Sequence, residues 1–168
     1  VIRDPRAILN SFQYVHQRST KLCKTENLGN TYRNIQRIHA AISAGNTFLC
    51  NNPSKCLPVY YEDVVAAPSE SISKICDFLG IDFQEAMLDT HNKNASSLLL
   101  AKDGVWYTSG LYDRKITEKR ANAWQIQLAT RQRKMVEHWF AKHPVSCLER
   151  YDLPHSGNLK GRIALKLR

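Results

Sequence analysis

The first eleven residues, VIRDPRAILNS, restrict the fold more than any other stretch of the chain. Val1 and Ile2 carry the β-branched side chains that are typical of a buried strand. Asp4 is a favoured helix N-cap and Pro5 suits the first helical position, so we expect a helix over residues 5–16. The stretch therefore predicts a strand–turn–helix unit, and the chain starts inside its strand.

Hydrophobic spacing along the rest of the chain predicts further helices and one more strand. Gly45 is expected to end one of the helices and Gly80 to cap another. The predicted elements are a helix at 28–44, a short apolar strand at 57–61, and helices at 68–79, 118–128 and 130–142. Strand–helix–helix–strand–helix order favours an α/β fold with a central parallel sheet and crossover helices.

One domain, or a large part of one, accounts for most of the 168 residues. Residues 1–151 carry the predicted elements and 43% of all residues are hydrophobic, which is enough for a core. Residues 152–168 are expected to form a basic tail. Between these parts, the irregular stretch 82–110 is a candidate functional loop.

The charge of the chain favours an anionic partner. Lys and Arg together number 24 against 15 Asp and Glu, which gives a net charge of +9 and a pI near 9.5. Phosphorylated nucleotides, acidic polysaccharides and lipid headgroups are all compatible with this charge, as is a simple solvated basic surface. No apolar run approaches the roughly 18 residues that a membrane span needs.

The turn after the first strand is a candidate phosphate site. Arg3 leaves the carboxyl end of a parallel strand, where α/β proteins bind ligands, and its guanidinium can hold a phosphate by two hydrogen bonds. Ser11 lies two helical turns further on and can offer its hydroxyl to the same anion. Arg6 adds a positive charge in the first turn, where it is unfavourable unless it meets an anion.

Cysteines and one sequon bear on the compartment. Cys50 and Cys56 flank a five-residue loop that a disulfide could close in an oxidising environment, and Cys76 is expected to be a buried thiol on a helix face. Asn94 begins an Asn-Ala-Ser sequon, a weak indication of N-glycosylation. No cysteine or histidine spacing typical of a metal site occurs in the sequence.

Two stretches in order resemble sulfotransferases. VIRDPRAILNS resembles the segment in which an arginine and a serine eight positions later hold the 3′-phosphate of the sulfate donor, and Arg3 and Ser11 have that spacing. LPVYYEDVVAAP followed by ISKICDFLGI is similar to a second signature, a strand ending in Tyr-Glu-Asp and then a helix ending in Phe-Leu-Gly. The resemblance extends over about residues 1–151.

Two further stretches indicate a branch of this family. KRANAWQIQL, with Trp124 as a core aromatic, is similar to a helix of Golgi carbohydrate sulfotransferases. WYTSG resembles their nucleotide-covering loop, which makes Thr108 and Ser109 candidate donor contacts, although Gly110 stands where the family usually has arginine. The resemblance implies a luminal Golgi glycoprotein with an N-terminal membrane anchor; YYED also occurs in cytosolic sulfotransferases, which keeps a cytoplasmic location open.

The resemblance also implies a fold and a reaction. It implies the C-terminal part of a P-loop-NTPase-like three-layer fold, and transfer of a sulfuryl group from 3′-phosphoadenosine 5′-phosphosulfate to a hydroxyl of a glycan or glycosaminoglycan, without a metal. The phosphosulfate loop and the catalytic base are expected upstream of Val1. We therefore expect no catalytic residue in this chain, and no activity from this chain alone.

Other interpretations of the chain compete with this one. His91, near Asp89, is a candidate base, but a solvated loop histidine is the simpler interpretation. Glu62 and Asp63 resemble an acid–base pair, but their place after a strand favours a structural role. A non-catalytic module that binds anions or glycosaminoglycans remains an alternative function, whereas nothing beyond charge supports nucleic-acid binding.

Overall fold

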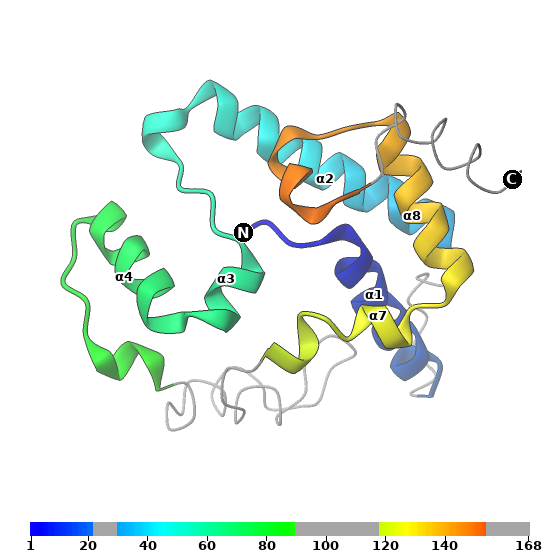
Figure 1. Cartoon of the computed structure of the whole chain (residues 1–168), viewed down its shortest axis with the longest axis horizontal. Coiled ribbons are helices and arrows are strands. Elements are labelled where there is room, and N and C mark those ends of the chain that lie inside the picture. The colour runs from blue at the N-terminus through cyan, green and yellow to red at the C-terminus, as the bar shows by residue number, and fades with distance from the viewer. Residues whose placement is uncertain (22–29, 90–117, 154–168) are drawn as a thin grey trace, which may run out of the picture.

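The computed structural model describes residues 1–21, 30–89 and 118–153, and these residues are mainly helical. Figure 1 shows their arrangement. The elements are α1 (Pro5–Lys21), α2 (Thr31–Asn51), η1 (Pro53–Lys55), α3 (Tyr61–Ala66), α4 (Pro68–Leu79), η2 (Glu85–Leu88), η3 (Glu118–Arg120), α7 (Trp124–Gln127), α8 (Thr130–Lys142) and η4 (Ser146–Tyr151), where η marks a 3₁₀ helix.

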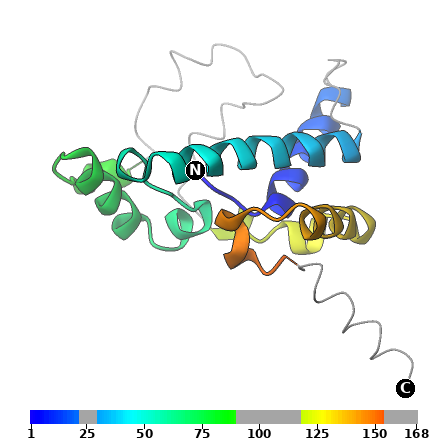
Figure 2. The ribbon, with the colours of Figure 1, turned by 90° about the horizontal axis from the view of Figure 1, so that it is seen from above.

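The main core lies where α1, α2, α7, α8 and η4 meet. Helix α1 packs on α2, α7 and α8, and α2 also packs on α8. Figure 2 shows the long helix α2 lying across the molecule beside α8. The buried side chains of this core are Ala7, Leu9, Ile35, Ile38, Trp124, Leu128, Val136, Phe140, Val145, Leu148, Tyr151 and Leu153.

Helices α3 and α4 form an arm at the opposite end of the molecule from α8 (Figures 1 and 2). The arm buries Cys76, as the sequence predicts, but leaves Phe78, Leu79 and Ile81 exposed. No helix in the described ranges is both long enough and apolar enough to cross a membrane.

A parallel β-bridge joins the N-terminus to the segment before α3. Ile2 donates its backbone N–H to Val59 at 2.7 Å and accepts the N–H of Tyr61 at 2.8 Å, which places Ile2 opposite Tyr60. Each segment runs directly into a helix, so two parallel strand ends and two helix N-termini lie side by side. Over the described residues the pairing is limited to this bridge, and the wider parallel sheet stays a prediction.

Two predicted helices match the structure. Helix α8 spans Thr130–Lys142 and α4 spans Pro68–Leu79, as the spacing predicts. Gly80 caps α4 in the left-handed conformation, with φ of 67°. The helix signals were sufficient there because Pro68 at the first position and Gly80 after the last leave little choice of bounds.

The other predicted bounds were wrong. Helix α1 continues to Lys21, because the polar residues after His16 contain no glycine or proline to end it. Helix α2 begins after Asn30, whose side chain accepts the N–H of Arg33, and it passes through Gly45 to Asn51. One glycine costs a helix only about 1 kcal/mol, which the packing of α2 on α1 and α8 outweighs.

Two shorter predictions also failed. In place of one helix over 118–128 there are η3 and the single turn α7, separated by a bend at residues 121–123. The predicted strand at 57–61 pairs only through the bridge at Tyr60, and Tyr61 already belongs to α3. In the first place η3 packs on α3 and α7 packs on α1, so the two turns serve different neighbours instead of continuing as one helix.

Helices α2 and α8 meet through a cluster of rings. The centroid of the His39 ring lies 5.4 Å from that of Phe140, 6.0 Å from that of Trp139 and 5.5 Å from that of His143. Burial lowers the pKa of His39, and the neighbouring charge of His143 lowers it further. The neutral imidazole is therefore the form that fits between the two helices.

This arrangement predicts that acid weakens the helix pair. Because the pKa of His39 is lower in the folded chain than its ordinary value of 6.5, the unfolded chain takes up the proton first as the pH falls through 6.5. The free energy of unfolding should therefore fall between pH 7 and pH 5, and His39→Gln should flatten this dependence. Urea unfolding at pH 7 and at pH 5 measures the change in the free energy of unfolding. His138→Gln, at an exposed position on α8, is the control; equal slopes for wild type and His39→Gln would contradict the prediction.

Candidate functional site

The candidate site lies where the two bridged segments end. Arg3 and Asp4 follow Ile2, and Tyr61 and Glu62 follow Tyr60, so the four residues lie at adjacent strand ends. The backbone N–H of Asp4 donates to Glu62 Oε1 at 3.3 Å, which links the two ends directly. The sequence placed each of these residues after a predicted strand but did not show that the two strands are adjacent. The structure shows that the strand end at Ile2 lies next to the one at Tyr60.

Asp4 caps α1, as predicted. Its Oδ1 accepts the N–H of Arg6 at 2.7 Å, and its side chain is buried. The carboxylate therefore occupies the N-terminus of α1, where the sequence had suggested room for an anion. A bound phosphate at this edge has to be held mainly by side chains.

The expectation for Arg6 was wrong. Its guanidinium is buried and donates from Nε and Nη2 to the carboxylate of Asp4, from Nη2 to the Tyr151 carbonyl at 2.7 Å, and from Nη1 to Glu137 at 3.4 Å. It also lies over the Trp124 ring, 4.2 Å from the centroid. The positive charge that looked unfavourable in the first turn is matched by Asp4, two residues earlier, rather than by a ligand.

Arg3 has a different environment. Its guanidinium lies 4.1 Å from the centroid of the Tyr61 ring, and Nη2 donates to the Arg120 carbonyl at 3.2 Å. Its Nε is buried and has no hydrogen-bond partner among residues 1–21, 30–89 and 118–153. A buried donor without a partner is costly, so an anion that accepts from Nε fits this position.

Ser11 is exposed on α1. It is six residues beyond Pro5, which places it about 9 Å further along the helix axis. The structure shows no hydrogen bond between Arg3 and Ser11, and their shared role in holding one phosphate stays a prediction.

Glu62 and Asp63 are structural carboxylates, as the sequence favoured. Glu62 Oε2 accepts the hydroxyl of Tyr151 at 2.6 Å, and Asp63 forms a two-pronged pair with Arg150 at 2.6 and 2.7 Å. The hydrogen bonds from Arg150 lower the pKa of Asp63. Burial and the bond to Glu62 raise the pKa of Tyr151, which keeps its hydroxyl protonated as a donor.

The thiols differ from the predicted disulfide. Cys50 and Cys56 are both free, with Cys50 exposed on the last turn of α2. Because α2 extends to Asn51, Cys50 lies on a helix, whereas the sequence predicted that it flanks a loop. The structure therefore gives no support for a Cys50–Cys56 bond.

Several predicted sites lie outside the described residues. These are the candidate donor contacts Thr108 and Ser109, the sequon at Asn94, and His91. Within residues 1–21, 30–89 and 118–153, no group of histidines, cysteines and carboxylates is arranged to hold a metal ion.

Sequence reasoning missed Tyr151 as part of this site. Tyr151 and Arg150 are separated from Glu62 and Asp63 by almost ninety residues in the chain, and no local pattern pairs them. Trp124 was predicted correctly as a buried core aromatic, but its contact with Arg6 was not foreseen. The sequence signal for these residues is the Arg150-Tyr151 pair itself, which follows the helix predicted over residues 130–142.

A family model described as "Sulfotransferase family" matches residues 1–85, which include both bridged segments and the Arg3–Ser11 stretch. The chain belongs to this family. The match ends before α7, α8 and η4.

Two curated relatives share a short part of the chain. A Caenorhabditis elegans protein named "Putative protein-tyrosine sulfotransferase" is 46% identical over 43 residues, and a Caenorhabditis briggsae protein of the same name is 42% identical over 45 residues. These stretches cover 25% and 26% of this chain but only 17% and 16% of the relatives. No solved structure matches the chain.

The buried pair of Arg6 and Asp4 generates a stability prediction. Arg6→Met leaves the Asp4 carboxylate buried without its cation, so the free energy of unfolding should fall by about 3 kcal/mol. Chemical unfolding followed by circular dichroism measures the change. The control is Lys74→Met, which removes an exposed ion pair with Glu70 and should leave stability almost unchanged. A denaturant midpoint of Arg6→Met equal to that of the wild type would show that the Asp4–Arg6 pair does not stabilise the fold.

Proposed function

We propose that this chain forms part of an enzyme that transfers a sulfuryl group from 3′-phosphoadenosine 5′-phosphosulfate to an acceptor hydroxyl. In this proposal Arg3 and Ser11 hold the 3′-phosphate of the donor. The observation that carries the proposal is the position of Arg3 at the end of a parallel strand segment inside the family match. Its buried Nε has no partner in the part of the chain that the structure describes.

The charges around Arg3 support an anion site. Asp4 is neutralised by Arg6, and Asp63 is paired with Arg150. Glu62 accepts hydrogen bonds from the Asp4 N–H and from Tyr151. With the nearby carboxylates occupied, the cation of Arg3 is available to a phosphate, and an arginine on an aromatic ring keeps a fixed orientation.

The residues of this chain bind and orient the donor. When bound, the donor supplies the sulfuryl group, which passes in line from its phosphate to the acceptor oxygen. Arg3 and Ser11 hold the 3′-phosphate and so orient the nucleotide. This orientation directs the sulfuryl group toward the acceptor and lowers the barrier to its transfer. Proton removal from the acceptor is assigned to residues outside this chain.

The acceptor in our proposal is a protein tyrosine. The sequence alone suggested a glycan, through the similarity of KRANAWQIQL to carbohydrate sulfotransferases. Both curated relatives are named for tyrosine, and the Trp124 that carried the glycan similarity packs on Arg6 in the core. A luminal Golgi location with an N-terminal membrane anchor remains part of the proposal on the family resemblance.

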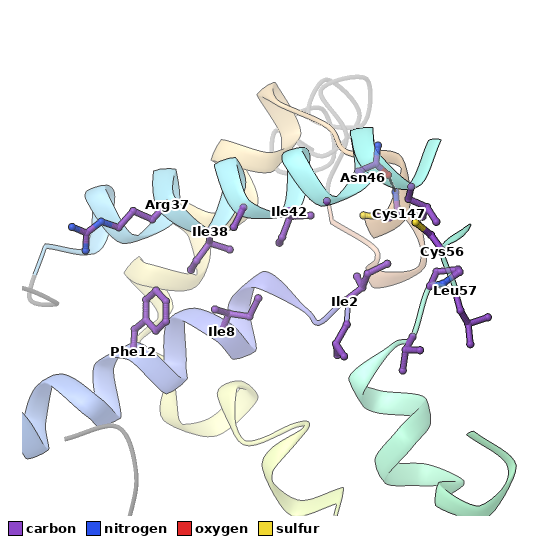
Figure 3. Close-up of a pocket in the computed structure, with 16 residues that line it drawn as sticks. Ile2, Ile8, Phe12, Arg37, Ile38, Ile42, Asn46, Cys56, Leu57 and Cys147 are labelled. Carbon is purple, nitrogen blue, oxygen red and sulfur yellow. Dashed lines mark hydrogen bonds between the residues drawn. The ribbon is translucent and has the colours of Figure 1, made fainter. Parts of the chain in front are cut away.

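The proposed fold is the predicted three-layer α/β arrangement, in which Ile2 and Tyr60 belong to a central parallel sheet. An open cavity of about 620 Å³ lies beside this bridge, between α1, α2 and residues 56–59. Figure 3 shows Ile2, Ile8, Phe12, Ile38 and Ile42 around it. An apolar space alongside a strand segment is suited to a further buried strand of the same protein.

Removing either phosphate contact should weaken donor binding. In the full-length protein, Arg3→Ala should lower the affinity for adenosine 3′,5′-bisphosphate at least about tenfold, and Ser11→Ala about fivefold, from the loss of charge-assisted hydrogen bonds. Titration calorimetry gives both affinities. Arg131→Ala, at an exposed position on α8, is the matched control. Wild-type affinity in Arg3→Ala would remove the basis of the assignment.

The acceptor can be tested separately. With labelled donor, the full-length protein should sulfate a tyrosine-containing peptide and leave the same peptide with phenylalanine unlabelled. An oligosaccharide ending in galactose or N-acetylglucosamine is assayed in parallel. Label on the sugar and none on the peptide would replace the tyrosine proposal with the glycan one, and label on neither would reject both.

A further inference from the structure

The 3₁₀ turn η4 contacts both acidic residues in the first turn of α3, Glu62 and Asp63. Tyr151 donates its hydroxyl to Glu62 at 2.6 Å, and Arg150 pairs with Asp63 at 2.6 Å. The Tyr151 carbonyl also accepts from Arg6 at 2.7 Å. This turn lies outside residues 1–85, yet it touches residues of both strand ends beside Arg3.

We propose that Tyr151 is a positioning residue for the 3′-phosphate site, acting by holding the Glu62 carboxylate away from Arg3. The inference rests on the proposed function of Arg3 and Ser11. It adds a residue to the donor site that neither the family match nor the sequence indicates.

Glu62 accepts two hydrogen bonds, from the Tyr151 hydroxyl and from the Asp4 N–H. Its short bond from Tyr151 is charge-assisted, whereas its bond from the Asp4 N–H is longer, at 3.3 Å. Tyr151 is 8% exposed, and its hydroxyl stays protonated, so it remains a donor throughout the neutral range. The phenol is therefore the stronger of the two groups that hold the carboxylate.

Loss of the Tyr151 bond to the Glu62 carboxylate affects Arg3, because both residues adjoin Tyr61. The guanidinium of Arg3 lies on the ring of Tyr61, the residue directly before Glu62. A carboxylate that loses its phenol partner turns toward other cations, and in our proposal it turns to Arg3 at the adjacent strand end, where it competes with a phosphate. Arg150 holds Asp63 in a comparable way, but that pair is half exposed and screened by solvent, so Tyr151 is the more important contact.

The test compares two nucleotides in the full-length protein. Tyr151→Phe removes only the hydroxyl and should lower the affinity for adenosine 3′,5′-bisphosphate about tenfold, with almost no change for AMP, which lacks the 3′-phosphate. Tyr32→Phe, an exposed tyrosine on α2, is the matched control. An equal loss for both nucleotides would indicate a merely structural role, and no loss for either would also overturn the proposal.

A second variant keeps the proposal testable if Tyr151→Phe folds poorly. Glu62→Ala removes the competing carboxylate itself, at a partly exposed position, and should leave the affinity for the bisphosphate unchanged or raise it. Combined with Tyr151→Phe it should restore most of the lost affinity, since no carboxylate is left to compete. A tenfold loss in Glu62→Ala would overturn the proposal. Arg3→Ala in the same titrations reports on the phosphate site itself, so a failure of the proposed function is seen independently.

Discussion

The buried pair of Asp4 and Arg6 is the interaction on which the rest of the candidate site depends. Asp4 begins α1 and links to Glu62 through its backbone, while Arg6 reaches Tyr151 and lies on Trp124. One ion pair thus connects the first strand end to α3, α7 and η4. A buried pair contributes little net stability by itself, but it requires well-defined geometry, and this pair fixes the backbone directly after Arg3.

Local signals were enough to predict some elements and not others. Gly80 and Pro68 gave the bounds of α4, and Asp4 was identified as a cap, because each acts within one helical turn. Arg6 was misassigned because two of its partners, Tyr151 and Glu137, are more than 130 residues away, and because the sequence used Asp4 only as a helix cap and not as the partner of Arg6. The sequence therefore identified Arg3 and Ser11 as candidates, whose role stays a prediction, and did not identify the residues that surround Arg3.

The two halves of the chain contribute differently to the site. The family match ends at residue 85 and contains Arg3, Ser11 and both strand segments. Trp124 and Tyr151, from beyond the match, cover Arg6 and hold Glu62. The residues that we propose to bind the donor and the residues that surround them thus come from separate parts of the sequence, and the sequence motif contains only the first group.

The bridge between Ile2 and Tyr60 also has a consequence for folding. It closes a loop of almost sixty residues with two backbone hydrogen bonds, and the contacts of Tyr151 close loops longer still. Helices such as α2 and α8 need only neighbouring residues to form, whereas these closures lose chain entropy before any contact compensates for it. The strand ends are therefore expected to assemble late in folding, around helices that are already present.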